Sequence, residues 1–75
     1  MNIKALRAFR ATLSEGSLAA ASRILNLSQP AVSRLISSLE GELRLTLFDR
    51  SKRNLTPTVE GTAFYREAGR ILDNL

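Results

Sequence analysis

The sequence predicts a mainly α fold, in which four helices are joined by short turns and by one two-stranded β-hairpin. Three observations predict it. Apolar residues recur every three or four positions in four separate stretches, which is the spacing of a buried helix face. A polar break over residues 26–28 separates two of these stretches. Between residues 45 and 57 the helical spacing gives way to two short apolar segments around a basic stretch, which is typical of a hairpin.

The composition limits what such a chain can be. Its 75 residues, 44% of them hydrophobic, suffice for one small core. Cysteine and histidine are both missing, so disulfides, thiolate metal sites and the commonest general base are excluded. We therefore expect no enzymatic activity, no metal and no cofactor.

Charge and hydropathy indicate the partner and the compartment. Eleven Lys and Arg against seven Asp and Glu give a net charge of +4, which favours a polyanionic partner. No apolar run approaches the roughly 18 residues of a membrane span, and the start of the chain lacks the pattern of a signal peptide. The sequence thus predicts a cytoplasmic protein that does not associate with a membrane.

Capping signals delimit the first two helices. The first begins at Ile3 and is expected to end at Glu15 or Gly16, because glycine accepts the left-handed conformation that follows a helix end. A serine then caps a second helix over residues 18–25, in which three consecutive alanines permit close approach by another helix.

The break at residues 26–28 is expected to be a tight turn. Asn26 is suited to a positive φ, Leu27 is expected to fill the space between the helices, and Ser28 is expected to cap the next helix. Two short helices around such a turn form a helix-turn-helix, whose second helix typically enters a DNA groove.

The third helix, residues 28–40, carries the candidate recognition surface. Its apolar side faces the core, and its other side is short and polar, which allows close approach to a groove. The amino-terminal amides suit phosphate, Gln29 can pair with an adenine edge, and Arg34 can reach guanine or phosphate. Glu40 and Glu42 would repel phosphate, so we expect the amino-terminal half to enter the groove. The candidate contacts are Ser28, Gln29, Pro30, Ser33, Arg34 and Ser37.

Residues 45–56 are expected to form a hairpin, which we call the wing. Pro57 favours an extended conformation at the preceding residue, which supports the returning strand. Cations at its tip could contact the DNA backbone or the minor groove. They are Arg50, Lys52 and Arg53.

The last helix, over residues 59–75, is expected to begin at the cap Thr58 and to carry an apolar stripe larger than one small domain needs. We expect this stripe to pack against the same helix of a second copy, placing two recognition helices about 34 Å apart. The alternative is that the helix folds back on its own domain. The predicted dimer contacts are Phe64, Ala68, Ile71, Leu72 and Leu75.

Several of these segments together resemble a known family. In their order and spacing they are similar to the N-terminal DNA-binding region of LysR-type transcriptional regulators, and the resemblance covers nearly the whole chain. The matching elements are LRAF at 6–9, GSLAAAS at 16–22, LNLSQPAVSRLISSLE at 25–40, LFDR at 47–50, Thr58 and Gly61.

The resemblance implies a winged helix-turn-helix over residues 1–58, made of three helices and a two-stranded wing, with the helix-turn-helix at about 18–39. Residues 59–75 would begin a long linker helix that dimerises. It implies sequence-specific binding of double-stranded DNA in a bacterial transcription regulator associated with the nucleoid. The DNA contacts that it implies are Ser28, Gln29, Pro30, Ser33, Arg34, Arg50 and Arg53.

Full-length members of the family also carry an effector-binding domain that resembles periplasmic binding proteins. No part of these 75 residues matches that domain, so a small-molecule effector is expected to act only through a domain absent from this chain. The chain is expected to form a homodimer, and the full-length protein a higher oligomer.

Two positions depart from the family pattern. Arg44 stands where a glycine usually follows the recognition helix, which implies that the cap at that helix end is strained or built differently. Pro57 stands where an apolar residue usually precedes the capping threonine, which implies looser packing of the wing on the core.

Other interpretations of the same surfaces remain open. The polar side of the third helix could be a solvated surface, and the basic tip could be an ordinary soluble hairpin. The helix-turn-helix could also serve as a protein-interaction module or as an RNA binder. Salt dependence separates phosphate-dominated binding from an apolar interface.

Overall fold

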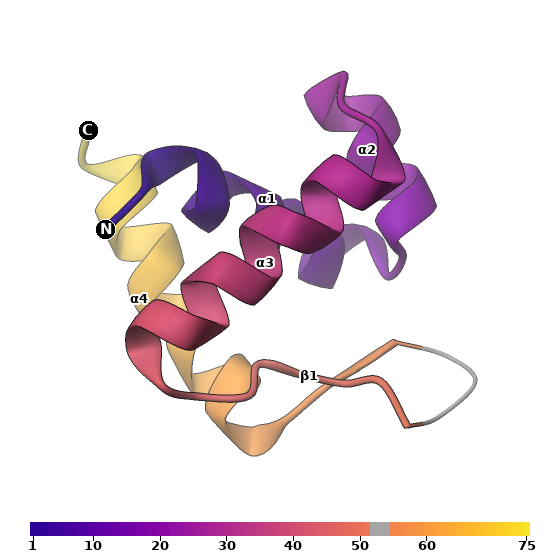
Figure 1. Ribbon diagram of the computed structural model, residues 1–75. Coiled ribbons are helices and arrows are strands. Elements are labelled where there is room, and N and C mark those ends of the chain that lie inside the picture. Colours follow the sequence, from indigo (N-terminus) through magenta and orange to yellow (C-terminus); the bar gives the residue numbers. More distant parts are fainter. Residues whose placement is uncertain (52–54) are drawn as a thin grey trace.

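The computed structural model contains four helices and one antiparallel hairpin, and it describes residues 1–51 and 55–75 (Figure 1). This is the mainly α, winged architecture that the sequence predicts. In chain order the elements are α1 (Ile3–Glu15), α2 (Leu18–Leu25), α3 (Gln29–Leu43), β1 (Phe48–Asp49), β2 (Thr56–Pro57) and α4 (Val59–Asp73). No helix among the described residues has the length and hydropathy needed to span a membrane.

Each helix begins at a polar cap in extended conformation. The side-chain oxygens of Asn2, Ser17, Ser28 and Thr58 each accept a hydrogen bond from an amide in the first turn of α1, α2, α3 and α4, respectively. Such bonds satisfy amides that have no partner inside the helix. The caps predicted at the second, third and last helices are confirmed.

A residue with a left-handed backbone conformation follows each of the first two helices, where the sequence predicts it. Gly16 follows α1 with φ 84°, and Asn26 follows α2 with φ 56°. Leu27 behaves differently from the expectation. It was expected to fill the space between the helices, but it is 41% exposed and lies in a shallow surface hollow beside Lys4 and Leu25. Leu25 of α2 and Leu35 of α3 are instead the partly buried residues that pack against the core there.

Helix α3 extends beyond the recognition segment at 28–40 and is followed by a residue with a strained backbone. It continues to Leu43, and Arg44 then adopts φ 57° while its amide donates to the carbonyl oxygen of Glu40. The left-handed conformation costs an L-residue other than Gly, Asn or Asp about 1 to 2 kcal/mol. A glycine, which the LysR-type regulators that the sequence resembles usually have at this position, would avoid that cost.

We therefore expect Arg44→Gly to stabilise the fold. The gain should be about 1 kcal/mol after allowance for the larger entropy of a glycine in the unfolded chain, which raises Tm by about 4 to 8 °C in a domain of this size. Thermal unfolding followed by circular dichroism measures it. Asn26→Gly is the matched control, because asparagine already tolerates this conformation. A decrease in Tm for Arg44→Gly would contradict the strain.

The core is built around α1, which packs against α2, α3 and α4. Phe9 lies at its centre with no exposed surface, and its ring centroid is 5.6 Å from those of Phe48 and Phe64 and 6.4 Å from that of Tyr65. Val32, Ile36 and Leu39 complete it from α3 and are buried. One aromatic cluster thus joins the first helix, the wing and the last helix.

The wing hairpin is shorter than predicted, with Phe48 paired to Pro57 and Asp49 to Thr56. The carbonyl oxygens of Thr46 and Leu47 explain the difference, because both accept hydrogen bonds from Thr58 and not from a returning strand. The base of the wing is nevertheless tightly packed, since Leu47 and Phe48 are almost fully buried. Pro57 itself is exposed, so it adds little to this packing.

Helix α4 folds back against α1 of its own chain, and an ion pair between Arg10 and Asp73 at 2.8 Å joins the two (Figure 1). Ala68 and Leu72 are buried in the core, and Phe64 packs on Phe9. Three of the five predicted dimer contacts, Phe64, Ala68 and Leu72, thus make contacts within their own chain, as in the alternative in which the helix folds back on its own domain. A periodic stripe alone does not tell which neighbour it meets.

Candidate nucleic-acid interface

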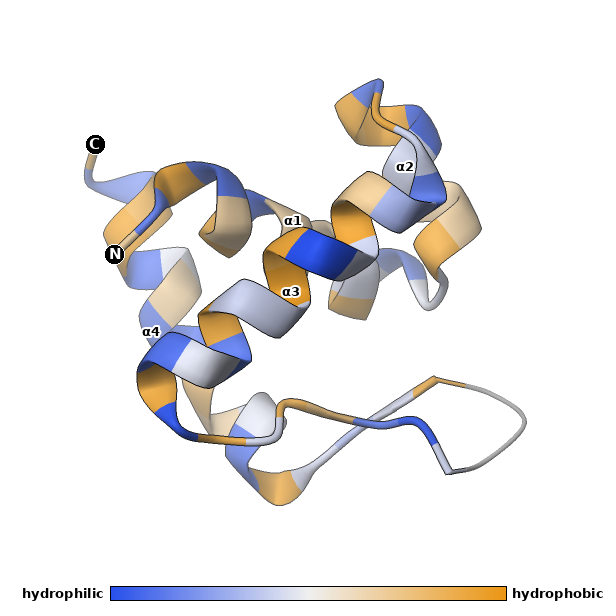
Figure 2. Ribbon diagram, viewed as in Figure 1, coloured by the Kyte–Doolittle hydropathy of each residue, from blue (hydrophilic) through white to orange (hydrophobic). Residues whose placement is uncertain are grey.

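The outer face of α3 is polar and accessible along the amino-terminal half of the helix. It is turned away from α1, which lies behind α3 in Figure 1, and Figure 2 shows hydrophobic and hydrophilic residues alternating along α3. The predicted contacts at its start are all exposed, whereas Ser33 is half-buried. The exposed ones are Ser28, Gln29, Pro30, Arg34 and Ser37.

Local hydrogen bonds hold the start of α3 in place. The amide of Leu27 donates to the carbonyl oxygen of Ser22 at 3.0 Å, and the hydroxyl of Ser28 accepts from the amide of Ala31 at 3.2 Å. Pro30 fits the first turn because it has no amide hydrogen to satisfy. The helix start is therefore fixed relative to α2 and presents its partial positive charge to solvent.

The wing lies alongside α3 (Figure 1), and Arg50 directly follows β1. Its guanidinium donates to the hydroxyl of Ser33 at 3.3 Å and lies 3.9 Å from the carboxylate of Glu40. The structure thus brings Arg50 together with the polar face of α3. Lys52 and Arg53, the other predicted contacts of the wing, lie outside the described residues.

Glu40 is the residue whose role sequence reasoning missed. It was considered as a group that repels phosphate, but its carboxylate also accepts hydrogen bonds from the amides of Leu47 and Phe48, at 2.7 and 3.3 Å. Local sequence patterns do not reveal these hydrogen bonds, because the two amides lie seven and eight positions further along the chain. Glu42 lies 3.6 Å from the terminal amine of Met1, so both acidic groups at this end of α3 have a cationic neighbour.

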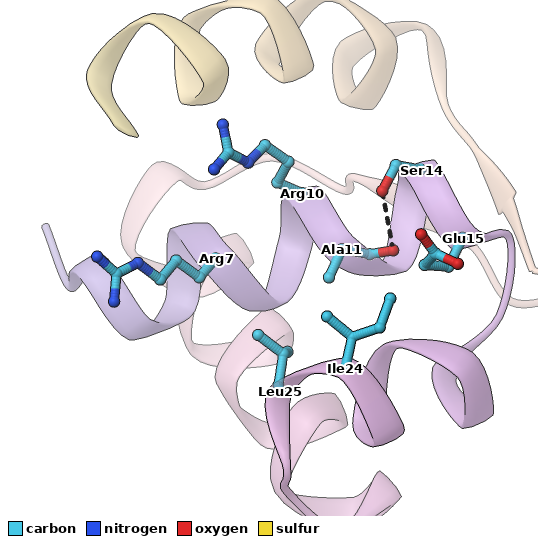
Figure 3. A pocket seen from close by; sticks show the side chains of 7 residues that line it. All are labelled: Arg7, Arg10, Ala11, Ser14, Glu15, Ile24 and Leu25. Atoms are coloured by element: carbon cyan, nitrogen blue, oxygen red, sulfur yellow. Dashed lines mark hydrogen bonds between the residues drawn. The ribbon is translucent and has the colours of Figure 1, made fainter. Parts of the chain in front are cut away.

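The surface hollows carry no comparable arrangement. One of about 260 Å³ lies between α1 and α2, where Ile24 and Leu25 face Arg7, Ala11 and Ser14 (Figure 3). The hydroxyl of Ser14 donates to the carbonyl oxygen of Ala11. Among the described residues no three His, Cys, Asp or Glu side chains gather as metal ligands would.

Comparison with known proteins assigns this architecture. The family model described as bacterial regulatory helix-turn-helix protein, lysR family, matches residues 3–62. The chain belongs to the LysR family. This LysR-type domain is 42% identical over 72 residues to the HTH-type transcriptional regulator ClcR of Pseudomonas putida, covering 96% of the chain. It is 42% identical, again over 72 residues and 96% of the chain, to the nitrogen assimilation regulatory protein nac of Escherichia coli.

Solved structures agree with the family assignment. The DNA-binding domain of BenM in its complex with benA site 1 DNA superimposes with a TM-score of 0.92 at 39% identity, covering 99% of this chain and 83% of that one. The DNA complex of the CbnR DNA-binding domain gives a TM-score of 0.91 at 38% identity, covering 97% and 84%. The chain is thus a LysR-type helix-turn-helix DNA-binding domain. It spans about a quarter of the length of the curated relatives, 24% for both ClcR and nac.

Proposed function

We propose that this domain directs a LysR-type transcription regulator to specific sites in double-stranded DNA, with the amino-terminal half of α3 in the major groove. The observation that carries the proposal is the exposed polar face at the start of α3, where Gln29 and Arg34 are free of core packing. Glutamine suits the hydrogen-bonding edge of adenine, and arginine suits guanine.

The wing would add contacts outside the major groove. Arg50 and the basic tip at residues 52–53 carry three cations within four positions, which suits the phosphate backbone or a narrow minor groove. Such contacts fix the register of the helix on the duplex, while the base contacts supply specificity. In this proposal the protein works at the nucleoid, in the cytoplasm.

Selection of binding sites from a random duplex pool tests the function. We expect one enriched sequence family, and binding that weakens linearly with the logarithm of salt concentration, with a slope of about 0.9 per neutralised phosphate. Binding that hardly responds to salt would instead favour a protein-interaction module. Failure to retain any duplex, with RNA retained, would favour the RNA-binding alternative.

Arg34→Ala should weaken binding to the selected duplex by about 1 to 3 kcal/mol and relax the base preference at one position. The reason is the loss of a side chain that presents paired donors to a base edge. Fluorescence anisotropy with the selected and a scrambled duplex measures both effects. Arg7→Ala is the matched control, because Arg7 is exposed on α1, which lies behind α3. Equal losses for the two variants would contradict a role in base recognition.

We also propose that the full-length regulator is a homodimer that uses α4, on the surface left free by intrachain packing. Ile71 in the last turn of α4 is 36% exposed, and Leu75, two residues beyond the end of the helix, is 71% exposed. Exposed apolar side chains that are close in the chain favour pairing with a second copy. Sedimentation that shows a monomer at all concentrations, and a selected site without two-fold symmetry, would count against it. A small-molecule effector would act through a domain outside these residues.

A further inference from the structure

The carboxylate of Glu40 connects three parts of the proposed DNA-binding surface. One oxygen accepts from the amides of Leu47 and Phe48 at the base of the wing, at 2.7 and 3.3 Å. The other lies 3.9 Å from the guanidinium of Arg50. The Glu40 side chain is 18% exposed, so the group is largely shielded from water, which would otherwise weaken its interactions.

Arg50 in turn contacts α3. A second nitrogen of its guanidinium donates to the hydroxyl of Ser33 at 3.3 Å, while the side chain remains 41% exposed. Because a guanidinium carries five donors, these two contacts leave others free for an external acceptor. The end of β1 and the middle of α3 are thus joined through one chain of polar groups, from Glu40 to Arg50 to Ser33.

The negative charge of Glu40 is unfavourable at a DNA-binding surface. A carboxylate close to a DNA-binding face repels phosphate, and a neutral acceptor such as glutamine could also bond the amides of the wing base. What glutamine lacks is the negative charge that attracts Arg50. A side chain already held in its bound position loses less conformational entropy when it meets its target.

We propose that Glu40 is a positioning residue that holds Arg50 against Ser33, so that the wing arginine and α3 meet the duplex as one preformed surface with higher sequence discrimination. The inference rests on the proposed DNA-binding function. Glu40 acts through Arg50 and does not itself contact DNA.

The test is Glu40→Gln, with affinities measured for the selected duplex and for a scrambled duplex of the same length. The variant keeps an oxygen for the wing amides, so circular dichroism should show an unchanged fold. Binding to the scrambled duplex should strengthen, because a negative charge is removed. The ratio of the two affinities should fall by about three- to tenfold, because Arg50 then no longer fixes the register of α3, and the base contacts that depend on this register are made only with the selected duplex.

Glu42→Gln is the matched control. It makes the same charge change two positions along the helix, at a side chain that is 48% exposed and has no contact with the wing among the described interactions. A general charge effect would raise both affinities and leave the ratio unchanged, as expected for Glu42→Gln. The same behaviour in Glu40→Gln would overturn the proposal.

A double-mutant cycle separates positioning from a structural role. In an Arg50→Ala background, Glu40→Gln should leave the ratio of affinities where Arg50→Ala puts it. A further fall of the ratio in that background would show that Glu40 acts by another route and would overturn the proposal. Should Glu40→Gln unfold, the cycle of Ser33→Ala with Arg50→Ala takes its place, and additive effects on the ratio would then reject the coupling. If the wild-type chain retains no duplex, the proposed function itself fails, which is a different result.

Discussion

Replacing Gly61 by alanine is expected to destabilise the fold by about 3 kcal/mol or more, although alanine normally favours a helix by about 1 kcal/mol over glycine. Gly61 lies in the first turn of α4 and is buried. A Cβ atom at this position would lie 2.1 Å from the carbonyl oxygen of Leu47 and 3.0 Å from its carbonyl carbon. These are backbone atoms, so no side-chain rotation can relieve the overlap.

The Leu47 carbonyl has little freedom to move away. Its oxygen accepts a hydrogen bond from the amide of Thr58 at 3.0 Å, and the amide of Leu47 donates to Glu40. The Leu47 side chain is fully buried. Relief of the overlap would therefore separate α4 from the base of the wing, which is why the expected loss exceeds that of ordinary overpacking.

Gly69→Ala provides the matched control within the same helix. A Cβ atom at Gly69 would meet no atom within 4 Å, so this change should stabilise the fold by up to about 1 kcal/mol. Urea unfolding followed by circular dichroism gives both values. Changes of the same sign in the two variants would show that the contact at Leu47 yields, and would contradict the argument.

The contrast between the two glycines shows how far the sequence leads. Thr58 could be predicted as a helix cap because the signal is local, and the same holds for Gly16 and Asn26 at the ends of α1 and α2. The close approach of Gly61 to Leu47 joins positions 14 residues apart, and capping and periodicity carry no information on it. In the sequence, only the family resemblance singles out Gly61.

The candidate site divides in the same way. Helical spacing places Gln29, Arg34 and Ser37 on the outer face of α3, where the structure has them. Spacing says nothing of Arg50, which belongs to the wing and meets Ser33 only after the chain has turned back. Such contacts depend on tertiary packing. The burial of Ala68 of α4 against its own chain depends on it as well.

The second large effect is expected for Phe9→Ala, which should cost about 3 to 5 kcal/mol. Phe9 has no exposed surface, and its ring meets those of Phe48, Phe64 and Tyr65. Aromatic pairs of this kind contribute about 0.5 to 1.5 kcal/mol beyond the area that they bury. We therefore expect the upper part of the range.

The loss should also reach the proposed DNA-binding surface. Phe9 is the residue of α1 whose ring contacts both β1 and α4, so a cavity there removes support from the wing base as well as from the last helix. Total stabilities of about 0.05 to 0.15 kcal/mol per residue imply that much of the folded population would be lost at 37 °C. Urea unfolding monitored by circular dichroism, together with binding to the selected duplex, measures both consequences.

Ile24→Ala is the control for removal of a large apolar side chain without a cavity. Ile24 is 61% exposed on α2, so its truncation should change stability by less than about 0.5 kcal/mol and leave DNA binding intact. Phe9→Leu should fall between the two, because it keeps part of the volume but none of the ring contacts. If Phe9→Ala unfolded at the same urea concentration as Ile24→Ala, the aromatic cluster could not be what holds the wing to the helices.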